Sequence, residues 1–240
     1  DSRLVCEVSR NKCIENQNNG ISIKCFSAAI LLENHCSRNS YSGIAYFGES
    51  SGEARGNICE ENRQNGIYVD GSSAPLLEGN RCDRNYDVGI YYQGESGGEA
   101  RGNRCYENGL DGIHLRESAA PKLMKNECVR NDRFGIIYGD NNSGEARGNS
   151  CEQNRWNGIT LCGSAAPNLI ENDCRRNDGC GIAYRGESGG EARGNCCEEN
   201  KECGIALDDR AAPELIDNQC NRNGTSGIVY RDESGGEARG

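Results

Sequence analysis

A single period of 23 runs through the sequence and limits the folds that this chain can adopt. The pair Gly-Ile recurs at this spacing, and Asn-x-Cys keeps it without insertion from Asn11 to Cys220. The string Glu-Ala-Arg-Gly returns at twice this spacing from Glu53 onward. A fixed period of this length is the signature of a solenoid, in which each repeat forms one coil and stacks on the next. We therefore predict about ten coils of 23 residues, paired into a 46-residue double-coil unit. The glycines of the Gly-Ile pairs are Gly20, Gly43, Gly66, Gly89, Gly112, Gly135, Gly158, Gly181, Gly204 and Gly227.

Each repeat contains three short extended segments separated by turns. The first begins with Gly-Ile, the second lies around Ala54 or Leu77, and the third carries the cysteine. Helical i, i+3, i+4 spacing of apolar residues is missing, while Gly and Asn interrupt the chain throughout. With 33 Gly and 35% hydrophobic residues, the chain is also poorer in apolar residues than a compact domain. We predict an all-β fold whose coils pair in parallel, ~4.8 Å apart.

The pattern N-x-C-x-x-N-x-x-x-G-I resembles the parallel β-helix repeat of the pectate-lyase-like superfamily, with Cys where an aliphatic residue is more common. The resemblance covers essentially residues 3–240 and implies a right-handed parallel β-helix with an asparagine ladder. A left-handed β-helix uses coils of roughly 18 residues, which a period of 23 does not fit. The resemblance leaves function open, because this fold hosts lyases, hydrolases, adhesins and binding modules.

Several columns of equivalent residues are interpreted as structural. Ile67 and Ile90 belong to an inward column of isoleucines that forms the spine of the core. Two residues later, Tyr alternates with smaller aliphatic residues, while Ala alternates with Leu in the second segment. Tyr shares a coil with Ala, so the core volume stays nearly constant from coil to coil. The 46-residue period is thus explained by packing and needs no ligand.

Three further columns follow the same logic. Asn57 and Asn80 represent asparagines that are expected to bond turn backbone groups and each other. Glu61 and Arg84 represent a column of alternating charge, interpreted as an exposed ion-pair ladder. Because acids neutralise the arginines one by one, nucleic acid is not expected as a partner.

The sixteen cysteines are interpreted mainly as packing residues. Cys59 and Cys82 belong to a single-file column of ten thiols, which offers no four-ligand arrangement around one metal centre. We predict no metal and no cofactor. Cys180 and Cys203 lie off this column on adjacent coils, within range of a disulfide, and their redox state is left open. Stacked free thiols favour a reducing compartment.

The outward face of the Gly-Ile segment is where enzymes of the resembling superfamily usually act. Hydrolysis of the polygalacturonase kind would need clustered aspartates, whereas Asp70 and Asp208 lie six coils apart. A pectate-lyase-like site would need several carboxylates for calcium beside a basic residue, and Asp70 and Arg116 come nearest. His114 is the best single acid–base candidate, but no carboxylate is expected to orient it. We assign no catalytic residue, and predict an interaction face formed by Phe47, Tyr68, Tyr91 and His114.

These observations favour a non-enzymatic structural rod that serves as spacer, scaffold or filament subunit. The alternative is a β-helix that binds carbohydrate or protein through the face from Phe47 to His114. A polysaccharide lyase or hydrolase is the third reading, and it depends on the family resemblance alone.

We expect one β-helix domain over residues 1–240, as a segment of a longer chain or with its ends covered by other subunits. Self-association by end-to-end stacking, a polysaccharide or a protein is the expected kind of partner. A net charge of -10 disfavours nucleic acid and anionic membranes. No apolar run reaches the ~18 residues of a membrane span.

Overall fold

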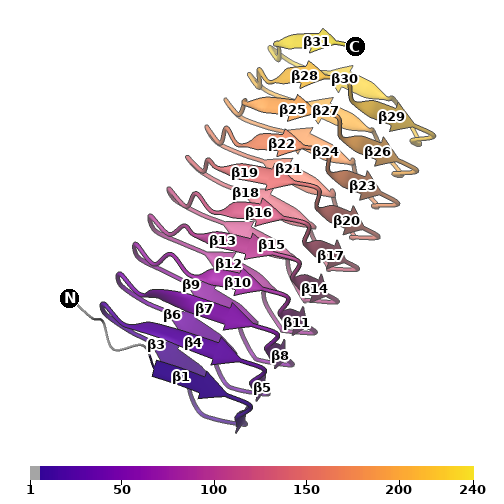
Figure 1. The fold of residues 1–240 in the computed structure, drawn as a ribbon. Coiled ribbons are helices and arrows are strands. Elements are labelled where there is room, and N and C mark those ends of the chain that lie inside the picture. Colours follow the sequence, from indigo (N-terminus) through magenta and orange to yellow (C-terminus); the bar gives the residue numbers. More distant parts are fainter. Residues whose placement is uncertain (1–5) are drawn as a thin grey trace.

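A computed structural model describes residues 6–240 as a parallel solenoid of three sheets (Figure 1). The first sheet has 11 strands and the other two have 10 each. The first sheet comprises β1 (Cys6–Ser9), β4 (Ala28–Leu32), β7 (Ser51–Arg55), β10 (Leu76–Glu78), β13 (Glu99–Arg101), β16 (Lys122–Met124), β19 (Glu145–Arg147), β22 (Asn168–Ile170), β25 (Glu191–Arg193), β28 (Glu214–Ile216) and β31 (Glu237–Arg239). The second comprises β2 (Lys12–Ile14), β5 (His35–Ser37), β8 (Ile58–Glu60), β11 (Arg81–Asp83), β14 (Arg104–Tyr106), β17 (Glu127–Val129), β20 (Ser150–Glu152), β23 (Asp173–Arg175), β26 (Cys196–Glu198) and β29 (Gln219–Asn221). The third comprises β3 (Ile21–Ile23), β6 (Ile44–Tyr46), β9 (Ile67–Val69), β12 (Ile90–Tyr92), β15 (Ile113–Leu115), β18 (Ile136–Tyr138), β21 (Ile159–Leu161), β24 (Ile182–Tyr184), β27 (Ile205–Leu207) and β30 (Ile228–Tyr230).

Every strand pairs in parallel with the equivalent strand of the next coil along the chain. Ile67 lies beside Ile90, Cys59 beside Cys82, and Leu77 beside Ala100. The predicted all-β parallel solenoid, with its coil period of 23, is therefore confirmed. Residues 6–240 form no helix, and among them no helical segment is suited to cross a membrane.

The core is a column in which each coil contributes one residue from each sheet and a second from the third sheet. Ile90, Tyr92, Ala100 and Cys105 are completely buried and follow one another around a single coil. The next coil replaces the pair Tyr and Ala by Leu and Leu, which are equally buried. Since interiors are packed to a nearly constant density, this exchange lets the coils stack without a void.

Substitutions in one coil should reveal this volume exchange. Ala100→Leu adds bulk to the coil that Tyr92 already fills, and we expect it to lower the free energy of unfolding by about 1–3 kcal/mol. The double variant Tyr92→Leu with Ala100→Leu recreates the composition of the neighbouring coils and should recover much of this loss. Urea denaturation of both single variants and the double variant measures the coupling. Additive losses would contradict volume exchange.

Asparagines at two corners of every coil form ladders inside the turns. Asn57 Nδ2 donates to Leu31 O at 2.9 Å and to Asn80 Oδ1 at 2.9 Å, and Asn57 N donates to that same oxygen. At the second corner, Asn39 Nδ2 donates to Cys13 O at 2.9 Å and to Asn62 Oδ1 at 2.9 Å. Each asparagine thus satisfies buried backbone groups that the turn would otherwise leave unpaired.

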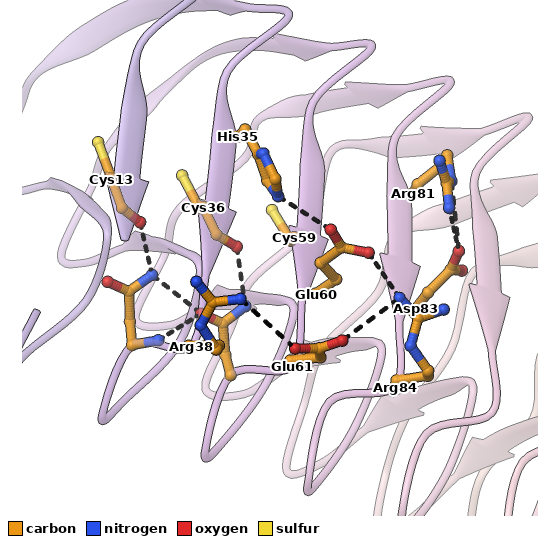
Figure 2. Close-up of polar contacts among 12 residues, drawn as sticks. Cys13, His35, Cys36, Arg38, Cys59, Glu60, Glu61, Arg81, Asp83 and Arg84 are labelled. Atoms are coloured by element: carbon orange, nitrogen blue, oxygen red, sulfur yellow. Dashed lines mark hydrogen bonds and ion pairs between the residues drawn. The ribbon is translucent and has the colours of Figure 1, made fainter. Parts of the chain in front are cut away.

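The residue before each second-corner asparagine has a left-handed backbone, although most of these residues are charged. Glu61 has a φ of 56° and Arg84 a φ of 52°. Arg84 Nη2 lies 3.6 Å from Glu61 and 2.8 Å from Glu60, and Glu60 also contacts His35 Nε2 at 2.9 Å (Figure 2). No ion pair joins Arg84 to Glu107 among the described residues. His35 is half-buried within this network.

Candidate functional site

Four ring side chains stack along the outer face of the third sheet. Tyr68 and Tyr91 lie in register on β9 and β12, with ring centroids 5.6 Å apart. His114 follows on β15 at 5.2 Å from Tyr91, and Phe47 adds an edge contact with Tyr68 at 5.7 Å. Alternation along each strand sends these residues outward while their neighbours enter the core. The structure therefore brings together all four residues of the predicted interaction face.

These rings line a hollow of about 670 Å³ on the outer face. The third sheet supplies its floor, and the turns that precede β6, β9, β12 and β15 supply residues beside it. Tyr41, Gln64, Asp87 and Leu110 occupy the same position in four successive turns and all line the hollow. The hollow therefore follows successive coils, with rings along its floor.

Asp111 occupies a turn position at which the side chain commonly accepts a hydrogen bond from a backbone N–H of the next coil. The residues before Gly20, Gly66 and Gly158 in this column are asparagines, and their Oδ1 atoms accept the equivalent backbone N–H of the next coil. The three pairs are Asn19 with Ser42, Asn65 with Val88, and Asn157 with Cys180. Asp111 performs the same task, because its Oδ1 accepts from Phe134 N at 3.1 Å. Its second oxygen remains free for another partner.

That partner is His114, whose Nδ1 lies 2.8 Å from Asp111 Oδ2. Asp111 is almost fully buried, so its position is fixed by the turn, whereas His114 keeps 23% of its side chain exposed. A carboxylate only accepts hydrogen bonds, so in the neutral imidazole this pairing places the hydrogen on Nδ1 and leaves the lone pair on Nε2. The expectation that no carboxylate orients His114 is wrong.

The signal for this pair was present in the sequence. Asn19, Asn65, Asp111 and Asn157 recur with the 46-residue period, and an aspartate replaces the asparagine only in the coil that carries the histidine. Asn157 Nδ2 contacts Thr160 Oγ1 at 3.0 Å with the same i, i+3 geometry. The column precedes the strand and lies outside the alternating face, which is why a search of strand positions alone missed Asp111.

Burial sets the electrostatics of the hollow. It raises the pKa of Tyr68 and of Tyr91, and the Arg116 guanidinium partly offsets the effect on Tyr91. Burial also raises the pKa of the Asp87 carboxyl above its usual range. Arg116 lines the same hollow and is only loosely paired, with its Nε 4.0 Å from Asp140. The hollow thus combines apolar rings with one loosely paired cation and two groups capable of proton transfer, His114 and Asp87.

The other residues singled out from the sequence lie elsewhere. Ile67, Ile90, Cys59 and Cys82 are inside the core, and Asn57 and Asn80 are in the first corner. Glu61 and Arg84 are at the second corner of the coil (Figure 2). Residues 6–240 contain no group of three or more His, Cys, Asp and Glu side chains placed to hold a metal ion. Asp70 is half-buried beside Tyr68, while Asp208 is held between Arg185 and Arg231.

The fold and this hollow define a parallel β-helix with an aromatic-lined outer face. Matches to the model of the right-handed beta helix region cover residues 1–145, 92–175 and 111–240, and the chain belongs to this family. The predicted relation to right-handed β-helix repeat proteins is therefore confirmed. No curated protein matches the sequence.

Solved structures with this fold include enzymes. A periplasmic alginate epimerase, AlgG, matches with a TM-score of 0.68 and 17% identity, over 89% of this chain and 59% of that one. The catalytic domain of a GH87 alpha-1,3-glucanase in complex with tetrasaccharides matches with a TM-score of 0.60 and 9% identity, over 95% of this chain and 64% of that one. The Agl-KA catalytic domain matches with a TM-score of 0.53 and 10% identity, over 98% and 61%. This chain therefore spans about three fifths of their length, and at these identities the likeness concerns the fold.

These matches correct the prediction of a non-enzymatic structural rod and the prediction that the chain is not an enzyme. The prediction of a rod rested on the regular ladders of the repeat, and the prediction that the chain is not an enzyme also rested on the lack of clustered carboxylates on the outward face of the Gly-Ile segment. The same coil architecture occurs in an alginate epimerase and in the catalytic domain of an alpha-1,3-glucanase. Ladders are what the stacking of coils requires, so they carry no information on how the outer face is used.

Proposed function

We propose that this chain binds an extended polyuronate along the third sheet and that His114 removes the proton at C5 of a bound uronate. The observation that carries the proposal is the His114–Asp111 pair at the end of the aromatic row. Sugar rings present apolar C–H faces that stack on aromatic side chains. Tyr68 and Tyr91 supply two such surfaces on adjacent coils, with ring centroids 5.6 Å apart, which is close to the length of one sugar residue.

The groups in the hollow suit proton abstraction next to a carboxylate. His114 Nε2 accepts the C5 proton, and Asp111 stabilises the imidazolium that forms. The charge that develops on the uronate carboxylate is stabilised by the Arg116 guanidinium on the same side of the hollow. Asp87, a carboxyl group that lines the same hollow, is the second proton-transfer group and serves when the C5 carbanion is quenched. Epimerisation and β-elimination both begin with this abstraction.

Hydrolysis of a glycosidic bond is less well supported. It needs two carboxylic groups that face the bond from opposite sides. Among the described residues, Asp87 is the carboxylate that lines the hollow, while Asp111 is committed to His114 and to the turn. The comparison that supports the abstraction chemistry is the one with the alginate epimerase, at 17% identity.

A deuterium-exchange experiment tests this function. The protein is incubated in D2O with polymannuronate, and we expect deuterium at C5 of the recovered uronates, measured by NMR. Tyr91→Ala should weaken polymannuronate binding about tenfold, or ~1.4 kcal/mol, because it removes the central ring of the row. Tyr86→Ala is the matched control, because this tyrosine is 76% exposed on a turn and does not line the hollow. Absence of deuterium together with equal binding by both variants would contradict the proposal.

A further inference from the structure

Two cysteines outside the core occupy the same position in successive coils of the third sheet. Cys180 and Cys203 directly precede Gly181 and Gly204, and Gly181 N donates to Cys203 O at 3.0 Å. Adjacent coils bring equivalent Cα atoms to ~4.8 Å, inside the roughly 4.4–6.8 Å range that a disulfide spans. Both thiols are free and buried, in a small cluster with Ala183 and Ala206.

The surroundings of the two sulfurs differ, and this difference suits a reaction first at Cys203 and then at Cys180. Cys203 Sγ lies 3.0 Å from Thr225 Oγ1 and 3.8 Å from Arg231 Nη2, so a hydroxyl and a guanidinium adjoin this sulfur. Cys180 Sγ donates to Glu202 Oε2 at 3.5 Å, and burial raises the pKa of Cys180 to about 12. Cys203 is therefore placed to react first, while Cys180 stays protonated beside a carboxylate that can accept its proton.

The ten-thiol column lacks these features. Cys174 and Cys197 are stacked in the same register but lie fully inside the core. Cys162 and Cys196 are half-buried, and each lies outside any such pair of thiols on the outer face. The pair at Cys180 and Cys203 thus differs from the core column and from Cys162 and Cys196 in both position and polar contacts.

We propose that Cys180 and Cys203 form a peroxide-reactive dithiol that closes to a disulfide between adjacent coils. The Cys203 thiolate attacks one oxygen of hydrogen peroxide; an S–O bond forms, the O–O bond breaks, and hydroxide leaves and is protonated to water. The Cys180 sulfur, which passes its proton to Glu202, then attacks Cys203 Sγ. The S–S bond forms, the S–O bond breaks, and the departing hydroxide takes the proton from Glu202. Two thiols are oxidised, and one peroxide is reduced to two waters.

Peptide mapping of the full chain provides a direct test. Trypsin separates the two thiols into the peptides 177–185 and 202–210, each with one cysteine. After limiting hydrogen peroxide, alkylation and digestion, we expect these peptides to be joined and the free thiol count to fall from sixteen to fourteen. The peptides that carry Cys174 and Cys197 should stay alkylated and unlinked. Linkage at those core cysteines to the same extent, or intact thiols at both Cys180 and Cys203, would overturn the proposal.

Variants assign the two roles. In Cys180→Ser the sulfenic acid at Cys203 cannot be resolved, so dimedone should label Cys203. In Cys203→Ser the thiol of Cys180 should remain unmodified under the same conditions. Arg231→Met should slow the loss of the Cys203 thiol about fivefold or more, since it removes the cation near the sulfur. Labelling of Cys180 in place of Cys203, or an unchanged rate in Arg231→Met, would refute this assignment.

Discussion

Asp111→Asn should reduce the rate of C5 deuterium exchange by roughly 10²–10⁴-fold and leave the fold and polysaccharide binding intact. The amide oxygen can still accept from Phe134 N, as asparagines do elsewhere in this column. The atom facing His114 Nδ1 then becomes an NH2 group, which donates instead of accepting. His114 must place its hydrogen on Nε2, and the nitrogen facing the hollow loses the lone pair that accepts the proton. The measurement is kcat by NMR alongside Kd by calorimetry.

Asn157→Asp is the matched control for this prediction. It makes the reverse exchange in the same column, three residues before Thr160, and should leave the exchange rate unchanged. A loss of rate in Asp111→Asn with an unchanged Kd separates orientation of the base from binding. If Asp111→Asn retained the full rate, His114 would not act through its pairing with Asp111, and the proposed proton abstraction would fail with it.

The repeat made the fold predictable because every coil repeats the same packing problem. Each coil places an isoleucine and a cysteine at equivalent core positions, and Tyr92 with Ala100 in one coil is replaced by Leu115 with Leu123 in the next. Comparison of neighbouring coils therefore predicts which residues share the core. The left-handed backbone at the corners was harder to predict. Glu61 and Arg84 have positive φ values, although neither is a glycine or an asparagine. The alternating charge of their column indicates ion pairs and carries no sign of the backbone conformation.

The site was predictable in its rings but not in its chemistry. Alternation along a strand places Tyr68, Tyr91 and His114 on one face, so their neighbourhood follows from the register alone. Asp111 reaches His114 from the turn, where a side chain's direction depends on the cap that its first oxygen makes with Phe134 N. The sequence period shows that Asp111 belongs to a column of turn residues. The pairing of Asp111 Oδ2 with His114 depends on contacts in three dimensions, which the period does not show. The prediction of a structural rod was wrong for a related reason. It treated residues that the stacking of coils requires as evidence of a structural function.

The largest effect on stability is expected from a change in the first asparagine ladder. Asn103→Leu should lower the free energy of unfolding by about 3–5 kcal/mol. Asn103 Oδ1 accepts from both Asn80 N and Asn80 Nδ2 at 2.9 Å, and its own Nδ2 donates to Leu77 O at 2.9 Å. Leucine fills a similar volume but leaves these donors and this acceptor buried without partners. The loss would be measured by urea denaturation.

Asn141→Leu is the control for side-chain replacement, because Asn141 is exposed in a loop, and its effect should stay within about 0.5 kcal/mol. Amide hydrogen exchange locates the damage: in Asn103→Leu the amides of Asn80 and of the corner around it should lose protection before those of distant coils do. This follows because coils in a solenoid contact only their neighbours, so a local defect lowers the local opening energy first. Equal stability of the two variants would mean that the ladder hydrogen bonds contribute little and that the Ile and Tyr core alone holds the coils in register.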